Sequence, residues 1–309
     1  MDKIINQIDG WLVIDKPYQM GSTDVVTKLK RFLHPSKIGH GGTLDPLATG
    51  VLPIALGKAT RLIPYVMDDE KVYEFEVTWG TQTTTDDIEG EALFTSNNRP
   101  ERAAIEKIIP AFLGVVDQLP PAYSALKVDG KRAYDLARRG VDVNLKPRPV
   151  RIDSLEIITH APDKTAFRVK CGKGTYVRSL GRDFGQMLDC YGHISQLRRI
   201  KNGPFSIKNA ILLEKIENGA YTATTLEVLP LETVLGDIPV LAVGKEEALR
   251  LILGQTLGKS FAKGLPETFS GNIIRVVCQN QLIALVKIQN GCLKPFRVFA
   301  APDSVSGLC

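Results

Sequence analysis

Cysteine and histidine are scarce in this chain of 309 residues. None of its five cysteines stands in a C-x-x-C pair, which argues against a zinc site and against a disulfide framework. The four histidines lack the spacing of metal ligands, so we expect no metal centre. Cysteines without a pairing pattern fit a reducing compartment, and we therefore predict a cytoplasmic location.

Long hydrophobic runs are also missing. The longest ones, such as Val51–Leu56, fall far below the roughly 20 apolar residues of a membrane-spanning helix, so we expect no membrane contact. The first residues include Asp2 and Asp9 and show no basic flank before an apolar stretch, so we expect no signal peptide. A composition of 44% hydrophobic and 24% charged residues excludes wholesale disorder, and the length predicts about two domains.

Three motifs of common enzyme classes are absent. The chain has no G-x-G-x-x-G after a strand pattern, no G-x-x-x-x-G-K-[ST] and no G-x-S-x-G. These absences argue against dinucleotide, nucleoside triphosphate and serine-hydrolase chemistry of the kinds that those motifs serve.

The net charge of +5 is distributed unevenly. Residues 1–120 carry a net −5, residues 121–210 a net +10, residues 211–240 a net −4 and residues 241–309 a net +4. Concentrated positive charge favours a polyanionic partner, most simply a nucleic acid. A solvated basic surface without a partner is the alternative.

Hydrophobic periodicity predicts a mixture of strands and helices. Lys71–Trp79 alternates strictly, with Tyr73 on its apolar face, which predicts a half-buried strand. The other expected strands are Gly10–Lys16, Val150–Thr159, Thr165–Cys171, Leu197–Ile207, Ile273–Cys278 and Leu282–Ile288. The expected helices are one that Ser22 caps and that reaches Leu33, then Glu101–Phe112, Arg132–Arg139, Tyr176–Leu188 and Lys245–Leu253.

A glycine-rich loop, Gly39–Gly50, contains the first candidate for chemistry. Asp45 precedes Pro46, a pattern that is common where a helix begins, so Asp45 is interpreted locally as a helix cap. Alternatively, Asp45 is a catalytic carboxylate that the loop presents to a substrate. The local pattern leaves both interpretations open.

Two further features also allow two interpretations. If Thr175 caps the next helix, then Lys173, Arg178 and Arg182 crowd its start, where the helix dipole favours acidic groups. Either a carboxylate or phosphate compensates these charges, or the side chains simply extend into solvent. Tyr73 is either a core residue or an aromatic platform for a nucleobase.

Seven segments in order carry a resemblance that covers almost the whole chain: Asp15–Val26, Gly39–Leu62, Lys71–Gly90, Leu119–Gly140, Arg148–Ile152, Gly172–Gly185 and Leu197–Phe205. Together they resemble the bacterial tRNA pseudouridine synthase B family, the TruB type. The resemblance implies an α+β fold with a mixed, mainly antiparallel central sheet and flanking helices. It also implies a catalytic domain over residues 1–236, with a mobile RNA-binding insertion at about 124–152, and a small PUA-like β module over residues 237–309.

The resemblance also implies the activity. Members isomerise uridine to pseudouridine at position 55 in the T loop of tRNA. The base is flipped out of its stack, the glycosidic bond is cleaved with the help of an aspartate, and the base is reattached through C5. The expected partner is the T arm of tRNA, and the enzyme is expected to be a monomer without cofactor or metal.

By position, the resemblance makes Asp45 the catalytic aspartate and Arg178 its partner. Tyr73 is the residue expected to stack on the target base, and Tyr176 and Leu197 are expected to line the pocket. The residues expected to bind RNA are His40, Lys16, Lys127, Lys131, Arg132, Arg138, Arg139 and Arg151. Lys16 is also expected, with Pro17, to brace the active-site loop.

The sequence departs from the family pattern at Gln19, where glycine is usual, and at Gly41, where threonine or alanine is usual. Two other functions remain open beside the expected one. The chain is either a non-catalytic RNA-binding module in which Asp45 is only a cap, or a member of the guide-RNA-dependent branch that modifies ribosomal RNA. Bacterial-type spacing and the lack of a long basic C-terminal tail argue against that branch.

Overall fold

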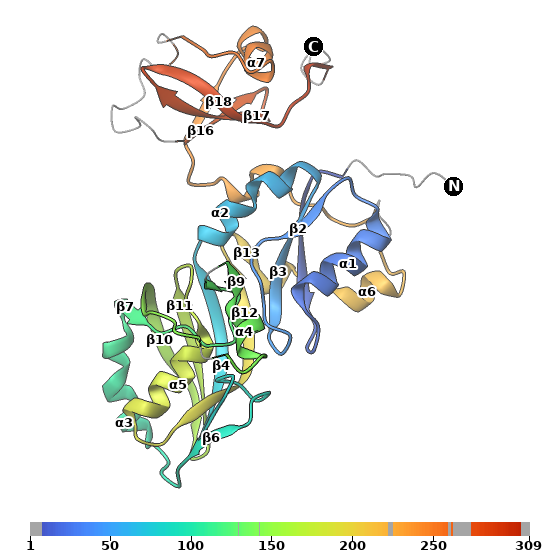
Figure 1. Ribbon diagram of the computed structural model, residues 1–309. Helices are drawn as coiled ribbons and strands as arrows, with labels where there is room; N and C mark the ends of the chain where they lie inside the picture. The colour runs from blue at the N-terminus through green and yellow to red at the C-terminus, as the bar shows by residue number, and fades with distance from the viewer. Residues whose placement is uncertain are drawn as a thin grey trace.

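A large sheet with helices on its flanks forms the body of the protein, and a small second sheet lies at one end (Figure 1). The computed structural model describes residues 8–128, 130–141, 143–221, 225–258, 261 and 273–303. In spatial order the large sheet consists of β14 (Ile211–Leu212), β1 (Gly10–Lys16), β3 (Thr49–Leu56), β12 (Gly192–Asn202), β4 (Lys71–Trp79), β11 (Lys164–Cys171), β10 (Arg148–Ala161) and β7 (Gly114–Gln118), with β13 (Phe205–Ser206) beside β12 and β2 (Ile38–His40) beside β3.

Most neighbouring strands of this sheet are antiparallel; β1–β14 and β3–β12 are parallel. The helices are α1 (Ser22–Leu33), α2 (Ile63–Asp68), α3 (Arg102–Ile108), α4 (Ala133–Ala137), α5 (Val177–Met187), α6 (Leu213–Glu217) and α7 (Lys245–Ile252). Short hairpins pair β5 (Thr81–Thr83) with β6 (Ala92–Thr95) and β8 (Lys127–Val128) with β9 (Lys131–Arg132). The predicted α+β class with a mainly antiparallel central sheet is confirmed.

Within its described residues, the C-terminal module contains four strands, β15 (Val240–Ala242), β16 (Ile273–Cys278), β17 (Gln281–Gln289) and β18 (Cys292–Val298). The predicted hairpin between β16 and β17 is present, and α7 packs on this sheet. Leu285 and Phe299 are buried against Trp11 and Leu62 of the body. The module therefore shares a hydrophobic contact with the large sheet.

Helix α5 covers one face of the large sheet and leaves part of the other face open. As predicted, Phe75 and Val77 point from β4 into the core, where Phe167 and Phe184 have ring centroids 5.1 Å apart. The alternating residues, such as Glu74, point to the open face. Strict alternation along β4 thus separates a hydrophobic core from a polar sheet surface.

Two predicted helix N-caps are wrong, because in each case the polar side chain bonds to another part of the structure and not to the start of the helix. Gly21 caps α1, and its backbone N–H donates to the Asp24 carboxylate. Ser22 is instead buried, with its hydroxyl bonded to the N–H and the carbonyl of Leu44. Similarly, Tyr176 and not Thr175 caps α5. In each case the polar side chain finds a tertiary partner or turns back on its own loop, which local pattern does not reveal.

The backbone of Gln19 explains why glycine is usual at that position. Gln19 has φ of +60°, in the left-handed region that costs a non-glycine residue roughly 1–2 kcal/mol. Because its side chain is exposed, Gln19→Gly should remove strain without loss of packing. We expect a net gain of up to about 1 kcal/mol in the free energy of unfolding, since the added freedom of the unfolded chain offsets part of it. Urea unfolding of both proteins measures it, and a less stable variant would contradict this account.

Candidate active site

The residues assigned to the site by resemblance lie around one cavity. Asp45 comes from the loop between β2 and β3, Tyr73 from β4, Tyr176 and Arg178 from the start of α5, and Leu197 from β12. All five line a cavity of about 290 Å³. Segments more than 150 positions apart in the sequence meet here because β12 lies between β3 and β4 in the sheet.

Asp45 is not a helix cap. The residues after it form a turn closed by a bond from Ala48 N–H to the Asp45 carbonyl, and β3 then begins at Thr49. No helix begins there, so the structural interpretation of Asp-Pro as a helix start is wrong. The Asp45 carboxylate is 41% exposed and forms an ion pair with Arg178, with 2.9 Å between Asp45 Oδ2 and Arg178 Nε.

Arg178 is buried and its guanidinium is held from several sides. Besides Asp45, its Nη1 donates to the Thr85 carbonyl at 3.0 Å and its Nη2 to the Tyr123 carbonyl at 2.9 Å. The Asp87 carboxylate lies 3.7 Å from Nη1. Since two backbone carbonyls fix the plane of the guanidinium, Arg178 presents Nε to Asp45 in one orientation.

The basic residues near the start of α5 therefore have carboxylate partners. Arg182 forms an ion pair with Asp86 at 3.0 Å and is itself buried. Lys173 pairs with Asp68, and both of those side chains are largely exposed. Of the three basic residues Lys173, Arg178 and Arg182, only Lys173 therefore extends into solvent.

Lys16 is fully buried, which corrects its expected contact with RNA. Its ammonium donates to the carbonyls of Pro17, Met20 and Pro46. The bond to Pro46 ties β1 to the residue after Asp45, so Lys16 supports the loop from below. Burial lowers the pKa of Lys16 to about 8, and the nearby negative charge of Asp45 opposes that decrease.

Arg199 supports the other side of the loop. It is buried, and its guanidinium donates to the carbonyls of Gly42 and Val51. At Gly50, where φ is +99°, a Cβ would lie 2.2 Å from the Arg199 carbonyl oxygen, so only glycine fits. At Gly41 a Cβ would lie 2.9 Å from Val66, which explains why the usual larger residue does not suit this chain.

The aromatic residues of the cavity are partly buried. Tyr73 packs against the core cluster and also lines the cavity. Burial raises the pKa of Tyr73 and of Tyr176, so both hydroxyls are neutral near pH 7. Leu197 completes an apolar wall beside these two rings.

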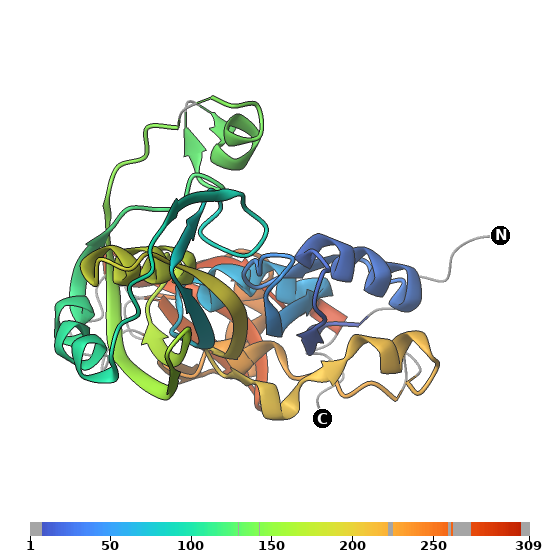
Figure 2. The ribbon, with the colours of Figure 1, turned by 90° about the horizontal axis from the view of Figure 1, so that it is seen from below.

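The residues predicted to bind RNA lie in several separate places. His40 is half-buried on β2; its Nδ1 has no hydrogen-bond partner, and burial lowers the pKa of its imidazole. The part of the predicted insertion (residues 124–152) that precedes β10 projects from the body (Figure 2), whereas residues 148–152 belong to β10 of the large sheet. The projecting part carries the exposed side chains of Lys127, Lys131, Arg132, Arg138 and Arg139. Arg151 is exposed on β10, where it pairs with Asp153 at 3.1 Å.

Sequence reasoning missed several residues of the site. Asp87 lies next to Arg178, yet the sequence indicates only a polar turn over Thr83–Gly90. Tyr134 of the insertion lies 5.8 Å from the guanidinium carbons of both Arg132 and Arg138. The spacing of Tyr134 and Arg138, one helical turn apart, is the signal that could have indicated this aromatic–basic cluster.

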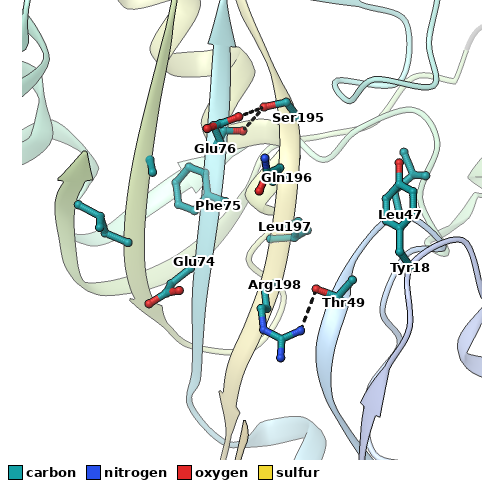
Figure 3. Close-up of a pocket in the computed structure, with 12 residues that line it drawn as sticks. Tyr18, Leu47, Thr49, Glu74, Phe75, Glu76, Ser195, Gln196, Leu197 and Arg198 are labelled. Carbon is teal, nitrogen blue, oxygen red and sulfur yellow. Dashed lines mark hydrogen bonds between the residues drawn. The ribbon is translucent and has the colours of Figure 1, made fainter. Parts of the chain in front are cut away.

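A second cavity of about 510 Å³ lies on the open face of the sheet (Figure 3). Tyr18 and Leu47 form one side, and β4 and β12 form the other. Its charged groups are paired: Ser195 donates to Glu76, and Arg198 binds Asp15 and Thr49. Leu197 belongs to both cavities, so the strand that carries it separates them.

Among the residues that the structure describes, no three His, Cys, Asp or Glu side chains are grouped so that they could hold a metal ion. Within the same residues, no helix is long and apolar enough to cross a membrane.

Comparison with known proteins identifies the family. The profile "TruB family pseudouridylate synthase (N terminal domain)" matches residues 30–177, and "tRNA pseudouridylate synthase B C-terminal domain" matches residues 178–236. The chain is 47% identical to tRNA pseudouridine synthase B of Rhodopseudomonas palustris over 94% of this chain and 81% of that protein. It is 44% identical to the Rhizobium meliloti protein of that name, over 95% and 96% of the two chains. The chain belongs to the TruB family.

Membership of the TruB family makes the chain an enzyme, an isomerase that converts uridine into pseudouridine. Two solved structures share its fold with a TM-score of 0.71: an H/ACA RNP bound to a substrate RNA, 23% identical, and a Cbf5-Nop10-Gar1 complex, 24% identical. They cover 95% and 96% of this chain, which in turn covers 86% of each of theirs. The predicted family, the fold class and pseudouridine synthase activity are therefore confirmed.

Proposed function

We propose that this TruB-family enzyme modifies the uridine at position 55 in the T loop of tRNA, with Asp45 as its catalytic carboxylate. The observation that carries the proposal is the Asp45–Arg178 ion pair in the wall of a cavity lined by Tyr73, Tyr176 and Leu197. The curated relatives named tRNA pseudouridine synthase B support tRNA as the substrate class.

The cavity suits a single flipped base. A base that is stacked inside an RNA fold must first be extruded, at a cost of a few kcal/mol. Contact with an aromatic ring offsets part of that cost, by about 1–3 kcal/mol per base. Tyr73 and Leu197 supply such apolar contact, and Ser124 and Ala125 at the start of the insertion also line the cavity.

Asp45 is placed to act on that base. Of the two carboxylates beside Arg178, Asp45 is 41% exposed, whereas the Asp87 side chain is 11% exposed. Asp45 can therefore reach a nucleotide, and Arg178 fixes its direction. The reaction breaks the bond between C1′ and N1, turns the base, and joins C1′ to C5. The proton leaves C5 and N1 gains one, so the isomerisation needs no further reactant.

In this proposal the insertion and the C-terminal module supply further contacts with RNA. Residues 1–236 form the catalytic domain, and its insertion grips the T arm through exposed basic residues. Residues 237–309 form a PUA-like RNA-binding module, of which β15 to β18 are described. The proposed enzyme is a monomer and cytoplasmic.

An isolated T-arm stem-loop tests the proposed substrate. We expect the purified enzyme to form pseudouridine at position 55 in this RNA without any guide RNA, measured by primer-extension stops after carbodiimide treatment. The same stem-loop with cytidine at position 55 should gain no pseudouridine. Dependence on a guide RNA, or modification of a different uridine, would contradict the proposal.

The insertion predicts a strong dependence on salt. Neutralising two exposed arginines, Arg138→Gln with Arg139→Gln, should weaken tRNA binding and reduce the slope of log K against log salt by about 1–2. The measurement is tRNA binding by filter retention at several salt concentrations. The matched control is Arg102→Gln with Lys107→Gln on α3, which should leave the slope unchanged. Equal effects of the two pairs would show that the insertion has no special role in binding.

A further inference from the structure

Arg182 lies one helical turn after Arg178 on α5 and has no part in the proposed reaction. Its side chain is buried, and each of its donor groups has a partner. Nη1 donates to Asp86 Oδ2 at 3.0 Å, Nη2 to the Leu119 carbonyl at 2.7 Å, and Nε to Asp183 Oδ1 at 2.9 Å. A buried arginine with this many bonds fixes the segments that it touches.

Arg178 and Arg182 bind the same two segments. Arg178 bonds to Thr85 in the loop after β5 and to Tyr123 at the base of the insertion. Arg182 bonds to Asp86 in that loop and to Leu119 at that base. The two arginines therefore form parallel ties between α5, the loop and the insertion, and only Arg178 also reaches Asp45.

Asp86 is the group through which the loss of Arg182 would affect the position of Arg178. Its side chain is 8% exposed, and its neighbours on both sides, Thr85 and Asp87, contact Arg178. The charged groups that face Asp86 are Arg182, Arg178 and Asp183 from α5, with Asp87 beside it in the chain. Without Arg182, the nearest cation to this buried carboxylate is Arg178. An unpaired buried carboxylate attracts any cation within reach.

We propose that Arg182 is a positioning residue that occupies the Asp86 carboxylate, so that the Arg178 guanidinium stays on Asp45. This inference rests on the proposed catalytic role of Asp45. Arg182 does not touch the cavity in which the base is bound. Its effect on the reaction passes through Arg178 alone.

The titration of Asp86 gives a readout that a purely structural role lacks. Burial raises the pKa of Asp86 to about 6, although Arg182 and Arg178 oppose that rise. Loss of Arg182 removes one of these opposing charges, so the pKa of Asp86 in Arg182→Met lies above its wild-type value. Ionised Asp86 competes for Arg178 above that raised pKa, and protonated Asp86 does not compete below it. The kcat of Arg182→Met relative to the wild type should therefore fall as the pH rises through that raised pKa, in a series from about pH 6 to about pH 9.5.

The test compares Arg182→Met, Asp86→Asn and the double variant in steady-state pseudouridine formation on tRNA, with kcat and KM measured across that pH range. We expect kcat of Arg182→Met to fall roughly 10- to 100-fold at the alkaline end of that range, with a smaller change in KM. The double variant should recover to within about threefold of Asp86→Asn, because it holds no competing carboxylate. Arg182→Lys should lose less than Arg182→Met, since it keeps a charge on Asp86.

Three results would overturn the proposal: an Arg182→Met deficit that is independent of pH, a double variant no better than Arg182→Met, or Asp86→Asn as impaired as Arg182→Met. If Arg182→Met does not fold, the double variant decides the matter. Activity near that of Asp86→Asn supports the proposal, and a loss beyond tenfold contradicts it. Asp45→Asn, assayed in parallel, separates a failure of the proposed catalytic role from a failure of this inference.

Discussion

Asp45→Asn is expected to abolish pseudouridine formation while the fold and tRNA binding persist. Asparagine keeps the size of the side chain but removes the carboxylate charge that the reaction needs, so we expect a loss of at least about 10³-fold in turnover. The Asp45–Arg178 pair is exposed on the Asp45 side, so the free energy of unfolding should change by only about 1 kcal/mol. Release of tritium from C5-labelled uridine in tRNA measures the reaction.

A matched substitution separates chemistry from general electrostatics. Asp68→Asn removes another carboxylate that pairs with a basic residue near the start of α5, but both partners there are largely exposed. This variant should retain nearly full turnover. tRNA binding of Asp45→Asn should match the wild type, because the basic insertion is intact. Full activity in Asp45→Asn would leave RNA binding without catalysis by Asp45 as the better account of this site.

Much of the fold could be predicted because local patterns and tertiary packing agree. Strand β4 alternates strictly in sequence, and the same residues alternate between core and surface in the structure. Strand β12 shows the opposite case: the pattern predicts a start at Leu197, but the strand begins at Gly192. Its first residues, Gly192 to Ile194, pair with the last residues of β4, Trp79 back to Val77, so pairing with a distant strand and not the local pattern sets that start.

The candidate active site was likewise predictable only in part. Asp45 and its pairing with Arg178 were expected from family resemblance, and the ion pair is present. The Asp86–Asp87 turn was not expected to contribute, because two acidic residues in a polar stretch indicate a solvated loop. Its burial depends on Arg178 and Arg182, which lie about 90 residues further along the chain. Only the assembled fold brings those charges together.

Arg178→Met should have the second largest effect, and unlike Asp45→Asn it should damage both turnover and stability. Loss of the guanidinium leaves Asp45 unoriented, and we expect turnover to fall by roughly 10²- to 10³-fold. It also leaves the buried Asp87 carboxylate and the Thr85 and Tyr123 carbonyls without this donor. Breaking a buried ion pair costs about 3–5 kcal/mol, which denaturant unfolding would measure.

Arg178→Lys isolates the part that geometry plays. Lysine restores the positive charge, but a single ammonium cannot face Asp45 and both backbone carbonyls with the planar fork of arginine. We expect stability to recover more than turnover, because the charge compensates Asp87 while Asp45 remains poorly oriented. Arg168→Met, at an exposed ion pair with Glu74 on the open face of the sheet, should change neither quantity appreciably. If Arg178→Lys were as active as the wild type, positive charge alone would suffice at Asp45, and the fixed direction of Nε would have no part in catalysis.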